Sequence, residues 1–119
     1  MRAFARCEGE GSIHMLRIYD TSLSVITRLR PFIEAIHGHD SDLARQLRRA
    51  SSSIVLNIAE GSYARGRRRE AHYHIALGSA KESKACLDVA VALGYVEAVD
   101  ARLFAELGDV CAVLYSLVT

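Results

Sequence analysis

The spacing of apolar residues limits the folds open to this chain more than any other feature. Four segments repeat apolar residues at alternating steps of three and four, as expected of helices that bury one side. No stretch alternates apolar and polar residues with period two, so nothing in the sequence supports strands. The pattern predicts an all-α fold, in which four helices with short connections form an antiparallel up-down-up-down four-helix bundle.

The first predicted helix contains a proline. A proline inside a helix removes a backbone donor and clashes with the preceding turn, so we expect a kink or a break at Pro31. The segment HGHDSD is then expected to end this helix. Its predicted apolar stripe comprises Leu16, Tyr19, Leu23, Ile26, Leu29, Ile33 and Ile36.

The second helix has signals at both ends. Asp40 or Ser41 is expected to cap its start, and Gly61 is expected to terminate it. The third helix is predicted over about residues 68–93, with small residues that allow close approach of a neighbour. In the last three helices the predicted stripes are Leu43, Leu47, Ala50, Ile54 and Ile58; Ala76, Ala80, Ser83, Leu87 and Ala90; and Val99, Leu103, Leu107, Val110, Leu114 and Leu117.

Length and composition indicate one domain without a membrane anchor. The chain has 119 residues, 50% of them hydrophobic and 24% charged, which suits a single core. We expect residues 1–12 to be a flexible leader and residues 13–119 to form the bundle. The leader lacks the apolar centre of a secretory signal, and no apolar run approaches the roughly 18 to 20 residues that span a bilayer.

The cysteines indicate neither disulfides nor a metal centre. Cys7, Cys86 and Cys111 are odd in number and widely spaced, which fits neither a disulfide framework nor a zinc site. A reducing cytoplasm is therefore the expected compartment, with Cys86 and Cys111 as small hydrophobic residues. We expect no cofactor.

Charge is unevenly distributed along the chain, although the net charge is only +1. From Arg45 to Arg69 there are seven arginines and one acid, giving 7 − 1 = +6. From Glu82 to Thr119 there are two bases and six acids, giving 2 − 6 = −4. Assembly of several copies would concentrate this polarity on one face.

A row of polar residues runs along the second helix beside its apolar stripe. At about 100° per residue, Arg49, Ser53, Asn57 and Glu60 fall in one narrow sector, which we expect to be partly buried. An unpaired charge in a helix interface costs roughly 3 to 5 kcal/mol, so a buried row must form a network that fixes helix register or a subunit contact. Two alternatives are that Arg48 and Arg49 reach a phosphate and that Glu60 is catalytic.

Several motifs of the second to fourth helices occur together in a known family. The segments QLRRASSSIVLNIAEG, HIALGSAKES and ALGY resemble the small four-helix bundle proteins first noticed in intervening sequences of bacterial large-subunit ribosomal RNA genes. The pattern is carried by Gln46, Arg48, Arg49, Ser53, Asn57, Ile58, Ala59, Glu60, Gly61, Ile75, Ala76, Gly78, Ser79, Glu82, Gly94 and Tyr95. Glu82 joins the predicted structural network on this basis.

The resemblance implies a left-handed bundle that assembles into pentameric rings. It also implies similarity to the accessory variability determinants of diversity-generating retroelements, which are basic pentamers that bind nucleic acid and a reverse transcriptase. No enzymatic activity is established for the family.

The segment YARGRRR is the strongest nucleic-acid signal in the sequence. Tyr63 is predicted to stack on a base, and Arg65, Arg67, Arg68 and Arg69 to neutralise phosphates, with help from Arg45 and Arg48. The alternative is a solvent-exposed or intersubunit loop whose arginines pair with the acidic fourth helix.

Other candidate sites have weaker support. His37, His39 and Asp40 could together hold a metal, but no further ligand pair accompanies them, so surface histidines are favoured. His72 and His74 are two apart on a helix and must point to different faces. No spacing indicates a catalytic triad.

The sequence thus predicts a non-enzymatic, homo-oligomeric protein that binds RNA or DNA as a ribosomal RNA or ribonucleoprotein accessory factor. The alternative is an oligomeric adaptor or scaffold whose partner is another protein. No membrane partner is expected.

Overall fold

The computed structural model describes residues 12–119, with side chains from residue 17 onward. Four helices span Ser12–His37 (α1), Ser41–Tyr63 (α2), Gly66–Ala92 (α3) and Ala101–Val118 (α4), and no strand occurs within these residues. The predicted all-α fold is confirmed. The leader and Cys7 lie outside the described residues, apart from Ser12, which begins α1.

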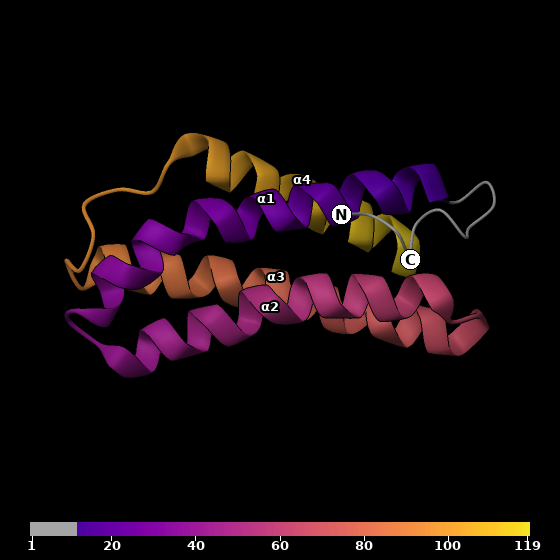
Figure 1. Ribbon diagram of the computed structural model, residues 1–119, viewed down its shortest axis with the longest axis horizontal. Coiled ribbons are helices and arrows are strands. Elements are labelled where there is room, and N and C mark those ends of the chain that lie inside the picture. The colour runs from indigo at the N-terminus through magenta and orange to yellow at the C-terminus, as the bar shows by residue number, and fades with distance from the viewer. Residues whose placement is uncertain (1–11) are drawn as a thin grey trace.

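The four helices lie along the long axis of a body measuring 45 × 25 × 20 Å (Figure 1). The chain reverses direction at each connection, and each helix packs against two neighbours: α1 against α2 and α4, and α3 against the same two. This arrangement is a four-helix bundle. Its left-handedness stays a prediction.

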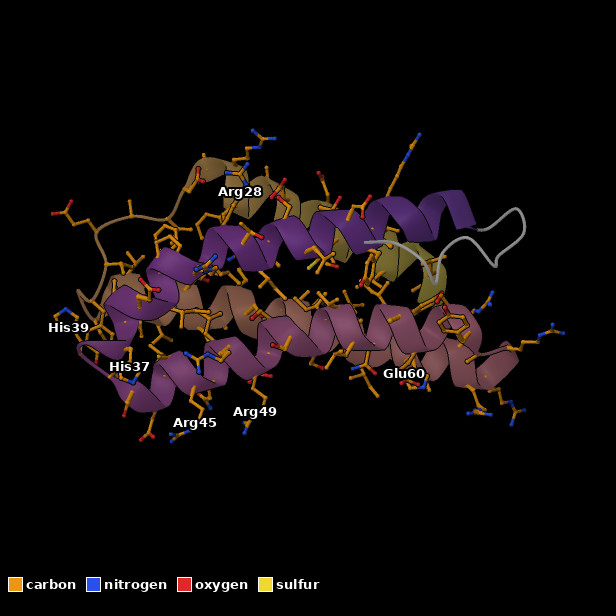
Figure 2. The ribbon with its side chains drawn as sticks, viewed as in Figure 1. Arg28, His37, His39, Arg45, Arg49 and Glu60 are labelled. Carbon is orange, nitrogen blue, oxygen red and sulfur yellow. The ribbon has the colours of Figure 1, made fainter. Side chains whose placement is uncertain are left out.

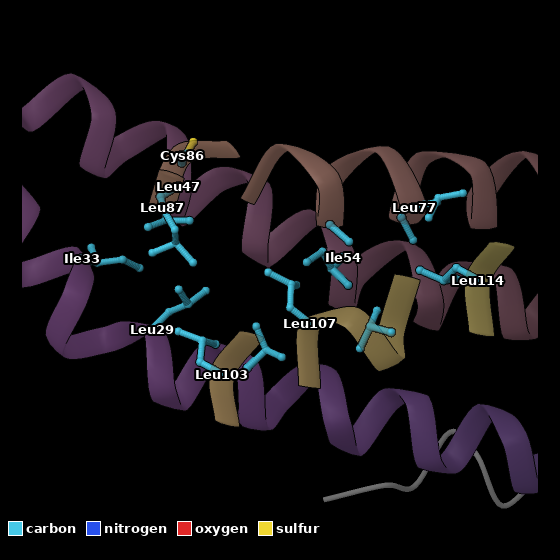
Figure 3. Packing of buried hydrophobic residues seen from close by; sticks show 14 of the residues in the cluster. Leu29, Ile33, Leu47, Ile54, Leu77, Cys86, Leu87, Leu103, Leu107 and Leu114 are labelled. Carbon is cyan, nitrogen blue, oxygen red and sulfur yellow. The ribbon is translucent and has the colours of Figure 1, made fainter. Parts of the chain in front are cut away.

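The buried residues of α2, α3 and α4 agree closely with the predicted stripes. All of the expected positions in α2 and α3 are buried, as are Leu103, Leu107, Val110 and Leu114 in α4. Leucines from all four helices meet in the centre of the bundle (Figure 3). At the ends of the fourth stripe, Val99 precedes the helix and Leu117 is exposed.

The stripe of α1 differs from the prediction in its first half. Ile18, Ser22 and Val25 are buried there, whereas Tyr19 and Leu23 are only partly buried. An apolar pattern could not identify this core face, because one of its positions is the polar Ser22. Ser22 can be buried because its hydroxyl donates to the carbonyl of Tyr19 at 2.8 Å. From Leu29 to Ile36 the predicted stripe is confirmed.

Pro31 does not break α1. The helix continues to His37, and its last part bends towards α2 (Figure 1). Pro31 is exposed, so its missing N–H and its ring lie on the solvent side of the helix, where a bend relieves the clash.

The end of α3 is tied to the start of α2. Gly94, with φ +79°, allows a Schellman motif in which the N–H groups of Gly94 and Tyr95 donate to Val91 and Ala90. This turn directs the Tyr95 hydroxyl to Asp40, 3.2 Å away. Asp40 also caps α2 by accepting from the Leu43 N–H at 3.0 Å, as the sequence predicted.

Gly61 has a different role from the one predicted. Helix α2 continues past it to Tyr63, and Gly61 is buried against α3. A Cβ at this position would lie 2.8 Å from Cδ1 of Tyr73, whose ring is itself buried. Gly61 therefore allows α2 and α3 to approach closely, and it does not terminate the helix.

No helix within residues 12–119 is both long and apolar enough to cross a bilayer.

Candidate nucleic-acid interface

The turn between α2 and α3 lies at one end of the bundle and carries the predicted arginine cluster. Ala64 and Arg65 are extended, and Gly66 begins α3 with φ +58°, a conformation that favours glycine. Arg65, Arg67 and Arg68 are exposed, and their side chains make no hydrogen bond or ion pair with residues 17–119. Three guanidinium groups without an acidic partner in residues 17–119 thus lie at this turn and in the first turn of α3.

Arg69 belongs to the structure of the bundle. Its Nε donates to the Gly61 carbonyl at 3.0 Å, and one terminal nitrogen donates to the Ser62 carbonyl at 3.2 Å. These carbonyls lie in the last turn of α2, where the helix leaves acceptors unsatisfied and its dipole favours a cation. The guanidinium of Arg69 is therefore engaged and separate from the exposed three.

A hollow of about 460 Å³ opens beside the turn. Its lining includes Arg67, Arg69 and Glu70 from α3 and Leu117 from α4. The ring of Tyr73 forms part of its wall but is only 2% exposed, so it offers no face for a base to stack on. Tyr63, in contrast, is 57% exposed.

The positive segment from Arg45 to Arg69 does not form one patch. Arg48 lies 15 residues before the end of α2 at Tyr63, which corresponds to about 22 Å along the helix, and Arg65 lies beyond that end. Figure 2 shows Arg45 and Arg49 on the part of α2 nearer His37, and Glu60 towards the opposite end. Arg45 pairs with Asp42 one turn earlier on the same helix.

Arg48 lies in a second hollow, between α1 and α2. This hollow measures about 270 Å³ and also contains Arg30, which the sequence reading did not single out. Neither arginine makes an ion pair within residues 17–119.

Glu106 of α4 and its N-cap residue Asp100 pair with α1 and not with the α2–α3 turn. The carboxylate of Glu106 accepts from Arg28 Nε at 3.1 Å and from the Ser24 hydroxyl at 2.9 Å, and Asp100 lies 3.5 Å from Arg28. Within one chain, the alternative in which α4 neutralises the YARGRRR arginines is therefore not supported.

The polar row of α2 is partly buried at its centre. Asn57 donates to the Ser53 carbonyl at 3.0 Å, and Ser79 of α3 donates to the Ser53 hydroxyl at 2.8 Å. His72, also of α3, lies 2.9 Å from the Asn57 carbonyl oxygen, which can only accept, so the pair needs a proton on Nδ1 of His72. These four residues tie α2 to α3 in register.

The charged members of the row are exposed. Arg49, Glu60 and Glu82 make no side-chain hydrogen bond or ion pair within residues 17–119. Glu60 cannot reach Arg49 along α2, because 11 residues separate them by about 16 Å. Within one chain the network is Ser53, Asn57, His72 and Ser79.

The residues considered for metal binding or thiol chemistry have other contacts. No three of His, Cys, Asp and Glu come together among the described side chains. His39 stacks on Tyr95 with ring centres 5.2 Å apart. Burial raises the pKa of both Cys86 and Cys111, and Glu82 adds to the rise at Cys86, so neither thiol is poised as a thiolate.

The bundle and its turn define a small helical protein with a cluster of free arginines at one end. The chain belongs to the 23S rRNA-intervening sequence protein family, whose model matches residues 15–116. A solved structure from Bacteroides thetaiotaomicron, described as a protein of unknown function from the S23 ribosomal protein family, is similar in fold, with a TM-score of 0.72 and 20% identity. The match covers 86% of this chain and 98% of that one. No curated protein matches.

Proposed function

We propose that this protein is a cytoplasmic, non-enzymatic homo-oligomer that binds RNA or DNA through the α2–α3 turn, as a ribosomal RNA or ribonucleoprotein accessory factor. The observation that carries the proposal is the exposure of Arg65, Arg67 and Arg68, none of which has an acidic partner in residues 17–119. Guanidinium groups bind phosphate oxygens bidentately, and neutralised phosphates release counterions. Tyr63 adds a surface for base stacking.

Assembly multiplies this charge. In the pentameric ring that the family resemblance implies, three free arginines per chain become 5 × 3 = 15 around the ring. A ring that brings the five turns to one face would present a continuous track for a nucleic-acid backbone.

The turn is tested by the triple variant R65S/R67S/R68S, which keeps Arg69 because of its role at the end of α2. Its affinity for labelled RNA or DNA, measured by fluorescence anisotropy, should fall at least tenfold and depend less steeply on salt. Its mass by light scattering should match the parent. An affinity equal to that of the parent would contradict the proposal.

The outer face of α2 and α3 supports self-association. Leu56 of α2 and Ile75 of α3 are 62% and 51% exposed, and they flank the Ser53–Ser79 contact at about the same height of the bundle. Arg49 and Glu60 lie seven residues before and four residues after Leu56, on the same side of α2, and both are exposed. Their charges are opposite in sign, so they would not by themselves repel a second copy.

The same face favours the second candidate function, an oligomeric adaptor that binds another protein. Leu56→Glu places a charge on this apolar surface and should dissociate the assembly, as light scattering would show. Tyr115→Glu, at a similarly exposed residue of α4 (58%), is the matched control and should leave the mass unchanged. If the Leu56→Glu variant has the same mass as the parent assembly, this face is not the assembly interface.

A further inference from the structure

We propose that the hollow between α1 and α2 is a second phosphate site, in which Arg30 and Arg48 hold one phosphodiester of the bound nucleic acid. This inference rests on the proposed function, because it assigns a further contact to the same ligand. The hollow of about 270 Å³ is smaller than the roughly 300 to 1,000 Å³ of sites that enclose a drug-sized molecule. The size of the hollow therefore suits one chemical group of a larger ligand, such as a phosphate.

The two arginines face each other across the groove. Helix α1 ends at His37 and α2 begins at Ser41. Arg30 precedes His37 by 37 − 30 = 7 residues, and Arg48 follows Ser41 by 48 − 41 = 7 residues. Because the chain reverses direction between them, equal distances from the turn put both residues at the same height on adjacent helices. Both line the same hollow.

This arrangement places two like charges in one hollow, and Glu34, which also lines it, makes no ion pair with either arginine. Four other basic side chains on the body of the bundle have an acidic partner, namely Arg28, Arg45, Lys84 and Arg102. Arg17, Arg49 and Lys81 have none within residues 17–119, but none of these three lines the hollow with Arg30 and Arg48. An anion between two guanidinium groups would turn their repulsion into two charge-assisted contacts.

The rest of the lining suits a singly charged phosphodiester. Ile26 and Ile33 provide apolar surface for a sugar, and the half-buried Ser52 carries a hydroxyl that makes no hydrogen bond within residues 17–119. Glu34 is also part of the lining. Its negative charge disfavours a multiply charged free phosphate more than a phosphodiester.

The groove and the turn together set a minimum ligand length. The 15 residues from Arg48 to the end of α2 at Tyr63 rise by about 22 Å, which corresponds to about seven base pairs of a DNA duplex at about 3.4 Å per pair. A strand long enough to reach both sites gains one phosphate contact over a shorter one.

The double variant R30Q/R48Q tests the groove with a labelled DNA duplex of about 16 base pairs, more than twice that span. Losing one charge-assisted phosphate contact should weaken binding roughly tenfold and lower the slope of log K against log salt by about one. The control K84Q/R102Q removes the same charge from α3 and α4, where both side chains already face acids. Its slope should equal that of the parent.

Each outcome decides the question. Equal slopes for the parent and R30Q/R48Q, with binding still sensitive to R65S/R67S/R68S, would overturn the groove and leave the proposed function intact. If R30Q/R48Q and K84Q/R102Q lost the same amount of affinity, the change in net charge would explain both losses. That result would also overturn the groove. If the parent binds neither this duplex nor a single strand of the same length, the proposed function fails and the groove fails with it. If it binds only the single strand, the same variants are compared on that strand. A thermal melt should show R30Q/R48Q folded at least as stably as the parent, since it loses a repulsion.

Discussion

Gly61→Ala should destabilise the bundle by about 1 to 2 kcal/mol, although alanine is the better helix former by about 1 kcal/mol. The new Cβ would lie against the ring of Tyr73, 2.8 Å from Cδ1, and that ring is buried between helices. Relieving the overlap requires α2 and α3 to move apart, and overpacking of this kind costs typically 1 to 3 kcal/mol. The urea midpoint, measured at fixed protein concentration, should fall.

Gly108→Ala is the matched control. Gly108 lies inside α4 and is exposed. Beyond its two chain neighbours and the backbone of its own helix, a Cβ added at this position would have no atom within 4 Å among the described residues. The control should gain up to about 1 kcal/mol from helix propensity alone. If Gly61→Ala were as stable as Gly108→Ala, Gly61 would not be the residue that sets the α2–α3 distance.

Arg69→Gln should also lower stability, by about 1 to 2 kcal/mol. The substitution removes two charge-assisted hydrogen bonds to the carbonyls of Gly61 and Ser62 at the end of α2. Because Arg69 is partly exposed, water replaces some of this interaction, and the expected loss is smaller than for a buried pair. Thermal unfolding followed by circular dichroism measures it.

The neighbouring Arg68→Gln separates structural from binding arginines. Arg68 is exposed and has no partner in residues 17–119, so its replacement should change stability by less than about 0.5 kcal/mol. It should weaken nucleic-acid binding, whereas Arg69→Gln should leave the affinity of the folded protein nearly unchanged. A reversed pattern would mean that the roles of the two arginines are exchanged.

Local patterns were sufficient to predict most of the fold. Apolar periodicity gave the faces of α2, α3 and α4, and the N-cap at Asp40 followed from local chemistry. The error in the face of α1 has a local cause, because the buried Ser22 bonds to the Tyr19 carbonyl of the same helix. The error at Gly61 arose because a contact from another helix decides the outcome. Gly61 was read as a helix end because glycine often occurs there, while its role depends on Tyr73, which lies on another helix.

The candidate site was less accessible to sequence reasoning. Arg68 and Arg69 are adjacent and identical in type, and only the position of the α2 carbonyls distinguishes them. Arg30 was missed because its partner in the groove, Arg48, is brought beside it by the α1–α2 turn. The partners of Ser53 and Asn57 come from α3, and the row within α2 could not identify them.

The most direct test of nucleic-acid binding by an arginine-bearing oligomer is the salt dependence of binding by the parent protein, on a particle whose mass is fixed by light scattering. One chain offers three arginines in its turn that have no acidic partner in residues 17–119, and one further phosphate contact in the groove. These four contacts limit its slope of log K against log salt to about −3.6 for duplex DNA. An assembly that engages several chains at once should give a slope steeper than about −4. Absence of binding at low salt by the same assembled particle, or binding that does not respond to salt, would contradict the account.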